Sequence, residues 1–144
     1  MKRIALLLLL IGCMAFAQTG AKSSAKPTVS SVRDAWIAAF NAKQADKVAA
    51  LYANDAVMIT PDSILNGRDA IRANIQKQLD AGATNVQVVS TKSGGDADFQ
   101  WDAGDYSQKV GTKEVRGRYL VNLRMVNGKW VLVAHASVPS AATK

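Results

Sequence analysis

The period of the apolar residues changes halfway along this 144-residue chain, and that change constrains its fold more than any other feature. Up to about Gly82, apolar residues recur every three or four positions, which is the helical period. From Asn85 onward, β-branched and aromatic residues alternate with polar ones, as they do in strands. Helices followed by a run of antiparallel strands predict an α+β fold, in which a curved sheet wraps around about three helices.

The helical half is predicted to contain three helices and one short strand. The apolar positions that define the helices are Val32, Trp36, Ile37 and Phe40, then Val48, Leu51 and Tyr52, then Ile71, Ile75 and Leu79. The predicted elements are helices over about 31–41, 45–53 and 68–81, with a strand over 56–60. Ser30 or Ser31 is expected to cap the first helix, because a hydroxyl accepts hydrogen bonds from the free amides of a first turn.

The strand half contains a β-hairpin around Asn127-Gly128, a pair that favours the type I′ turn. The residues that its first arm places on one face are Val115, Gly117, Tyr119, Val121, Leu123 and Met125. The second arm is apolar on both faces, which is typical of a central strand covered on each side. A further strand is predicted where Phe99, Trp101 and Ala103 alternate with more polar residues.

Residues 1–17 have the pattern of a secretory signal peptide. Lys2 and Arg3 precede an apolar run, Ile4–Ile11, that is too short to span a bilayer as a helix. Ala15-Phe16-Ala17 has the small residues of a cleavage site. Cys13 offers an alternative, because it ends a stretch that resembles a bacterial lipobox. The chain is therefore expected to be exported, either periplasmic or secreted or held to a membrane through a lipid on Cys13.

The rest of the chain is expected to form one domain. Residues 18–29 are rich in Ser, Ala, Lys and Gly and predict a flexible leader. A domain over 30–140 and a tail over 141–144 follow. This length is enough to bury one core. Because Cys13 is the only cysteine, no disulfide is expected inside the domain.

The charge pattern argues against several classes of partner. The chain carries 18 Lys and Arg against 11 Asp and Glu, a net charge of +7, but the basic residues are scattered. Arg116, Arg118 and Arg124 share a strand face, which indicates a solvated face rather than a polyanion site. Basic residues interleaved with stacking aromatics are missing, so no nucleic acid is expected. One histidine and one cysteine predict no metal site, and no cofactor motif is present.

The ordered set of motifs resembles the nuclear transport factor 2-like superfamily, in particular its SnoaL-like branch, also described as domain of unknown function 4440. The motifs that carry the resemblance are Trp36–Phe40–Asn41, Leu51–Ala56, Gly67–Ile71, Gly104–Tyr106 and Asn127–Leu132. The resemblance implies a cone-shaped, cystatin-like α+β fold with a pocket between the sheet and the helices. It also implies a homodimer, since the outer face of such a sheet usually packs on a partner. It does not imply one activity, because a fold hosts many functions.

Ketosteroid isomerases belong to this superfamily, but this chain has other residue types at the positions of their catalytic residues. Their catalytic aspartate precedes the proline of the short strand, where this chain has Thr60. Their first-helix tyrosine falls at Trp36, and their oxyanion aspartate falls near Val121 and Asn122. A threonine hydroxyl is too weak a base to replace a carboxylate at neutral pH. Ketosteroid isomerase chemistry is therefore not expected, and whether the chain is an enzyme stays open.

His135 and Asp102 are the candidate catalytic residues. His135 is the only histidine, and its ordinary pKa near neutrality suits a general acid or base. Asp102, on a neighbouring antiparallel strand, is expected to orient it, with Tyr119 or Tyr52 completing an acid/base set. The alternative is a hydrogen-bonded structural histidine near the end of its strand. On strand alternation, His135 is expected to share a face with Val131 and Val133.

The candidate ligand-binding residues are Trp36, Phe40, Tyr52, Met58, Thr60 and Tyr119. They could line an apolar pocket, and the alternative is that most of them are core. Two functions follow. The first is an exported domain that binds a small apolar or mixed-polarity molecule, with weak isomerase, cyclase or lyase chemistry. The second is a non-catalytic dimeric scaffold of the bacterial envelope whose cone is filled by its own side chains. An open cavity that reaches Trp36, Thr60 and His135 would favour the first.

Overall fold

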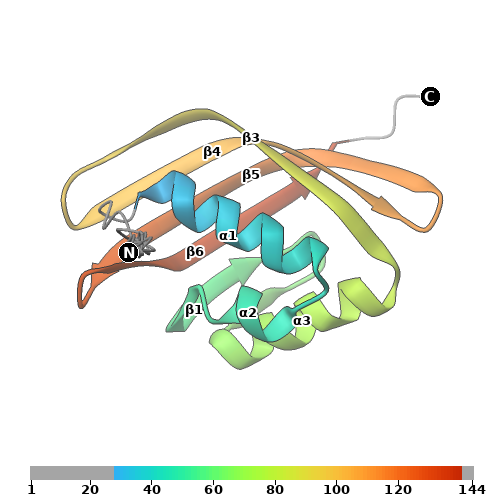
Figure 1. Cartoon of the computed structure of the whole chain (residues 1–144), viewed down its shortest axis with the longest axis horizontal. Helices are drawn as coiled ribbons and strands as arrows, with labels where there is room; N and C mark the ends of the chain where they lie inside the picture. Colours follow the sequence, from blue (N-terminus) through green and yellow to red (C-terminus); the bar gives the residue numbers. More distant parts are fainter. Residues whose placement is uncertain (1–27, 141–144) are drawn as a thin grey trace, which may run out of the picture.

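A computed structural model describes residues 28–140 and gives the α+β fold that the sequence predicts. The elements in chain order are α1 (Val29–Asn41), α2 (Ala45–Ala49), β1 (Tyr52–Ile59), β2 (Ile64–Asn66), α3 (Arg68–Asp80), β3 (Ala83–Gly95), β4 (Phe99–Val110), β5 (Lys113–Val126) and β6 (Lys129–Pro139). Figure 1 shows the long strands curving around α1, with α2 and α3 beside β1. None of the described helices is both long and apolar enough to cross a membrane. The expected signal peptide, Cys13 and nearly all of the leader and tail lie outside the described residues.

All six strands form one sheet in the order β2-β1-β6-β5-β4-β3. Neighbouring strands are antiparallel except β1 and β6, which are parallel. The predicted hairpin is confirmed: β5 and β6 pair across Asn127-Gly128, where both residues have the positive φ that a type I′ turn requires. β6 is central in strand order, as expected. The helices lie on one face of the sheet, called the inner face below, so β6 is not covered on both sides within residues 28–140.

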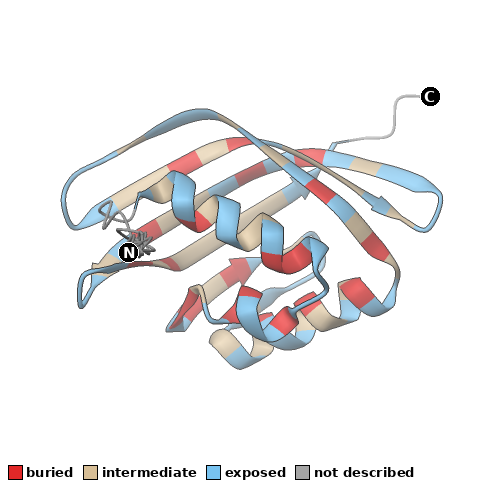
Figure 2. Cartoon of the chain, viewed as in Figure 1, coloured by how far each residue is buried: buried red, intermediate tan, exposed pale blue. Residues whose placement is uncertain are grey.

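The hydrophobic core lies between the helices and the inner face of the sheet (Figure 2). The helical stripes predicted for α1 and α3 supply Phe40, Ile71 and Ile75, all at most 1% exposed. β5 supplies Leu123, also 1% exposed, from the face that its alternation predicts. Burial of such apolar side chains is the main contribution that stabilises a domain without disulfides.

Thr28, rather than Ser30 or Ser31, caps α1. The Thr28 hydroxyl accepts a hydrogen bond from the backbone amide of Ser31 at 3.2 Å. The Ser31 hydroxyl in turn accepts one from the backbone amide of Thr28 at 3.0 Å, which makes a capping box. The predicted cap was wrong by two or three residues, because Thr28, Ser30 and Ser31 all carry the hydroxyl that the capping position prefers.

The prediction of a helix over 45–53 was wrong in its second half. α2 ends at Ala49, and Tyr52 already belongs to β1. The backbone amide of Leu132 on β6 donates to the carbonyl of Leu51 at 2.9 Å, and Tyr52 pairs with Leu132. Pairing with the last strand therefore overrides the local helical pattern. This pairing turns the Tyr52 side chain into the core.

A β-bulge in β6 decides where His135 points. Asn122 on β5 pairs with Ala134, whereas the next residue, Leu123, pairs with Leu132, so Val133 is an extra residue. An extra residue shifts the alternation by one position. His135 therefore shares the inner face with Leu132, and the expectation that it shares a face with Val131 and Val133 was wrong.

Candidate functional site

A cavity of about 110 Å³ lies among α1, α3 and the inner face of the sheet. Its walls are mostly aliphatic, with one tryptophan and one methionine. The apolar residues that line it are Val29, Val32, Trp36, Met58, Ile75, Val86, Val88, Val121, Leu123 and Leu132. The polar residues that line it are Arg33, Gln78, Asp102, Tyr106, Gln108, Tyr119, His135 and Ser137. An apolar cavity with a few convergent polar groups is the usual form of a small-molecule site.

His135 reaches this cavity at the end of a short hydrogen-bond chain. The Trp36 Nε1–H donates to the Tyr52 Oη at 3.0 Å, and that oxygen lies 2.7 Å from the His135 Nδ1. The Tyr52 and His135 rings are stacked, with centroids 6.2 Å apart and planes 9° apart. The backbone of Tyr52 is also held in place, because the Arg68 Nε donates to its carbonyl at 2.8 Å.

Burial keeps both members of the Tyr52–His135 pair neutral. Burial lowers the pKa of His135 to about 4, because the imidazolium would lose its hydration. Burial also raises the pKa of Tyr52 well above its usual value of 10. At neutral pH, His135 is therefore an uncharged imidazole that carries one proton.

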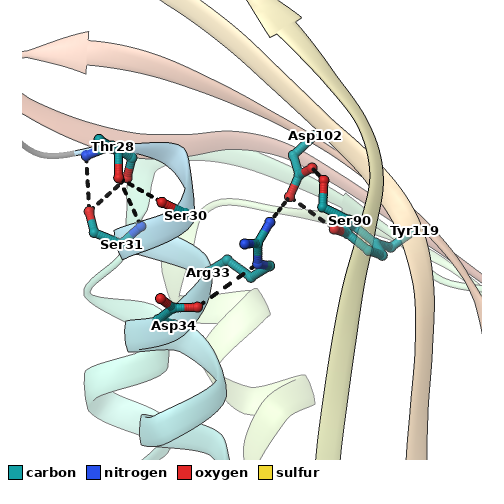
Figure 3. Close-up of polar contacts among 8 residues, drawn as sticks. All are labelled: Thr28, Ser30, Ser31, Arg33, Asp34, Ser90, Asp102 and Tyr119. Carbon is teal, nitrogen blue, oxygen red and sulfur yellow. Dashed lines mark hydrogen bonds and ion pairs between the residues drawn. The ribbon is translucent and has the colours of Figure 1, made fainter.

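Asp102 forms a second polar group on the cavity wall, and Figure 3 shows its carboxylate next to the side chains of Arg33, Ser90 and Tyr119. Its side chain is 1% exposed and carries three hydrogen bonds. The Arg33 Nη1 donates to Oδ2 at 3.0 Å, and the Tyr119 hydroxyl donates to the same oxygen at 2.9 Å. The Ser90 hydroxyl donates to Oδ1. A buried carboxylate needs such partners, because an unpaired one would be costly to desolvate.

Arg33 next to Asp102 is charged, whereas Tyr119 is neutral. Burial opposes the charge of Arg33, but the hydrogen bond and negative charge of Asp102 outweigh it and raise the pKa of the guanidinium. Burial and the same carboxylate raise the pKa of Tyr119 to about 12, so its phenol keeps its proton. Arg33 and Asp102 form a charge-balanced pair, and Tyr119 donates to it without adding charge.

The structure does not bring Asp102 and His135 into contact. Asp102 on β4 pairs with Val121 on β5, and Val121 pairs with His135 on β6. The two residues therefore lie in one row across the sheet with a strand between them. Neighbouring strands are about 4.8 Å apart, which places the two backbones about 10 Å apart. Asp102 orients Arg33 and Tyr119 instead of His135, and Tyr52 takes the place next to the imidazole.

The predicted ligand-binding residues divide into three groups. Trp36, Met58 and Tyr119 line the cavity. Phe40 and Tyr52 are fully buried behind the wall, where the Phe40 ring stacks on Trp36 at 5.0 Å between centroids. Thr60 lies away from the cavity, and its hydroxyl bonds Ser63 in the turn after β1. The structure thus has a cavity that reaches Trp36 and His135 but not Thr60.

Arg33 and Ser90 are the site residues that sequence reasoning missed. Arg33 occupies a position of the apolar stripe of α1, one turn after Val29 and three residues before Trp36. A lone charge on such a stripe is a signal for a buried partner, since buried charges are paired. Ser90 carries no such signal, because an uncharged serine in a strand is compatible with the exposed face, where most serines lie.

Residues 28–140 contain no group of three or more His, Cys, Asp or Glu side chains placed to hold a metal ion. The arginines expected on one strand face are exposed, and each has an acidic neighbour. Arg116 lies 3.0 Å from Glu114, Arg124 lies 3.7 Å from Asp55, and Arg118 lies 3.9 Å from an aspartate on β4. Such exposed pairs contribute little to stability but reduce the local positive field.

The match to a protein-family model agrees with this architecture. The model of the SnoaL-like domain matches residues 34–133, which contain every strand up to the middle of β6. The chain therefore belongs to the SnoaL-like domain family, within the nuclear transport factor 2-like superfamily that the motifs predicted. No curated protein matches the chain.

Solved structures support the same fold. A putative calcium/calmodulin-dependent protein kinase type II association domain from Thiobacillus denitrificans is 25% identical, with a TM-score of 0.68 over 79% of this chain and 96% of that one. A nuclear transport factor 2-like protein of unknown function from Shewanella oneidensis is 14% identical, with a TM-score of 0.69 over 76% and 94%. A ketosteroid isomerase-like protein from Erwinia carotovora atroseptica is 15% identical, with a TM-score of 0.69 over 78% and 94%.

Proposed function

We propose that this chain binds a small molecule of mixed polarity in the cavity between α1, α3 and the inner face of the sheet. The observation that carries the proposal is the placement of His135 and the Arg33–Asp102 pair on the wall of one largely apolar cavity. A core that only had to be stable would gain little from a buried ion pair, because apolar side chains of the same volume serve as well or better. Polar groups that converge on an apolar cavity instead give a ligand orientation and specificity.

The same groups support weak acid/base chemistry on a bound molecule. Isomerisation, cyclisation or elimination next to a carbonyl needs a hydrogen-bond donor at the oxygen and a proton acceptor nearby. The His135 imidazole and the Asp102 carboxylate are the groups of the cavity wall that fit these two roles. Their backbones are about 10 Å apart, so a molecule the size of one ring can lie over Val121 and reach both.

The test is thermal unfolding in the presence of a panel of small ketones, hydroxy acids, aromatic polyketide fragments, steroids and fatty acids. A ligand at a hundred times its Kd stabilises the folded state by about 2.7 kcal/mol, which raises the unfolding midpoint. Val121→Phe is expected to fill the cavity and abolish the shift. Leu120→Phe is the matched control: it changes the preceding residue, whose side chain lies on the outer face, and should leave the ligand-induced shift unchanged. Shifts that survive Val121→Phe would refute the cavity as the binding site.

A second copy of the chain is the partner that the outer face fits. Ile59, Ala136, Leu120 and Ala103 are paired in register across four strands of that face. Ile59 is 48% exposed and Leu120 is 44% exposed, although both are large and apolar. The likeness to solved structures described as association domains supports self-association of this kind. A homodimer is compatible with ligand binding and also serves the scaffold role.

Export is the remaining part of the proposal. The basic residues, apolar run and small residues of 1–17 support a signal peptide, and Cys13 supports lipid attachment as the alternative. Cell fractionation with a Cys13→Ala variant distinguishes the two. Membrane attachment that is lost in the variant indicates lipidation, whereas soluble periplasmic protein in both cases indicates cleavage after Ala17.

A further inference from the structure

The Tyr52 hydroxyl is enclosed between two ring nitrogens, and its proton has only one place to go. Tyr52 is 0% exposed, so water cannot accept its hydrogen bond. The Trp36 Nε1 lies 3.0 Å away, but an indole N–H only donates. The His135 Nδ1, 2.7 Å away, is the acceptor within reach among the described residues. The Tyr52 proton therefore points at Nδ1, and Nδ1 carries no proton.

The opposite ring nitrogen of His135 is thereby a donor. A neutral imidazole holds one proton, so an unprotonated Nδ1 requires a protonated Nε2. The described part of the chain provides no hydrogen-bond partner for Nε2, and it contains no buried side-chain nitrogen or oxygen without a partner. Nε2 is therefore accessible, and the accessible space next to His135 is the cavity.

We infer that Tyr52 fixes His135 as its Nε2–H tautomer, and that the cavity therefore takes a ligand that places an uncharged carbonyl oxygen at this N–H. The inference rests on the proposed ligand-binding function and specifies its ligand. An acceptor is required because the free ring nitrogen can only donate. An uncharged acceptor is favoured because Arg33 and Asp102 already balance each other and His135 adds no charge. Ketones, aldehydes, esters and amides satisfy these conditions, whereas ammonium groups do not.

Tyr52 is a positioning residue in this arrangement, since it does not line the cavity. Its hydroxyl decides which nitrogen of His135 carries the proton, and the Trp36 N–H fixes the direction of that hydroxyl. A carbonyl bound to Nε2–H would be polarised by a neutral donor. Proton acceptance from the ligand would fall to another group of the cavity.

The tautomer can be measured directly, because His135 is the only histidine of the chain. The full chain, ¹⁵N-labelled and without a histidine tag, is studied at pH 7 by long-range ¹⁵N–¹H correlation from the ring carbon-bound protons. A protonated Nε2 and an unprotonated Nδ1 are expected. Tyr52→Phe should produce a detectable Nδ1–H population, whereas Trp36→Phe should keep the Nε2–H form. A protonated Nδ1 in the unsubstituted protein overturns the inference, as does an unchanged tautomer in Tyr52→Phe.

The ligand requirement is tested with cyclohexanone and its hydrocarbon isostere methylenecyclohexane, each followed by the chemical shifts of the cavity residues. His135→Leu is expected to weaken cyclohexanone about five- to tenfold, the value of one hydrogen bond, and to leave methylenecyclohexane unweakened. If the substitution changes both affinities equally, the carbonyl inference is wrong while the binding function stands. If neither compound binds at millimolar concentration, the inference and the proposed function both fail.

Discussion

The stability of this domain is expected to fall as the pH drops from about 6.5 to about 4, because of His135. In the unfolded chain the imidazole has its ordinary pKa of about 6.5, whereas burial lowers the pKa in the folded protein to about 4. Between these values the unfolded chain binds a proton that the folded protein does not. The contribution of His135 is therefore fully present above pH 6.5 and is lost as the pH falls toward 4.

The size of the effect follows from the difference between the two pKa values. A pKa lowered from 6.5 to about 4 corresponds to about 3.5 kcal/mol, since one pKa unit is worth about 1.4 kcal/mol. The His135 residue is half-buried, so solvent screening reduces this figure, and we expect a loss of about 1.5–3 kcal/mol. That loss is a large share of the roughly 5–15 kcal/mol that stabilises a typical domain.

Urea denaturation of the unsubstituted chain and of His135→Gln, at pH values from 4 to 8, isolates this contribution. Glutamine cannot titrate, and carboxylates contribute equally to both proteins. Asp96 is one such carboxylate, whose pKa is lowered by hydrogen bonds from two backbone amides. The difference in free energy of unfolding between the two proteins should shrink by about 1.5–3 kcal/mol on acidification. A difference that stays constant with pH would mean that His135 is solvated and that the Tyr52–His135 arrangement is wrong.

Other substitutions test the polar cluster, the sheet and the outer face. Asp102→Asn should lower the free energy of unfolding by about 2–4 kcal/mol, because the Arg33 guanidinium loses its carboxylate. Tyr119→Phe should cost only about 1–2 kcal/mol, and equal losses for the two variants in urea denaturation would contradict the ion pair. Gly104→Ala places a Cβ 2.0 Å from a backbone oxygen of β3 and should cost at least about 1–3 kcal/mol; unchanged thermal stability would show that β3 can move aside. Leu120→Glu should turn a dimer into a monomer in light scattering with unchanged circular dichroism. A monomer before substitution would rule out the second copy.

The fold could be predicted from the sequence because each element with a buried face has apolar residues at the spacing of that element. The stripe of Ile71 and Ile75 in α3 and the alternation of β5 through Leu123 both report a buried face, and both are confirmed. The helical pattern failed at Leu51 and Tyr52, where pairing with β6 decides the local structure. A partner so distant in sequence leaves no trace in a local pattern.

The site could be predicted only in part, for a similar reason. The sequence alone singled out His135 and Asp102 as candidates because of their side-chain chemistry, and both line the cavity. Which groups they bond depends on strand register and on the position of α1, which sequence periodicity does not give. Asp102 bonds Arg33 from α1, and His135 meets Tyr52 from β1, so each partner comes from an element far away in the chain.

The bulge at Val133 separates two parts of β6 whose inward-facing residues differ in character. Before it, Trp130 and Leu132 face inward and belong to the core; after it, His135 and Ser137 face inward and line the cavity. If β6 kept strict alternation through Val133 instead of forming the bulge, Ala134 and Ala136 would face inward in place of His135 and Ser137. Such a strand would keep an apolar interior and would lose the two polar groups that β6 presents to the cavity. One added residue thus allows a single strand to contribute apolar side chains to the core at one end and polar side chains to the cavity at the other.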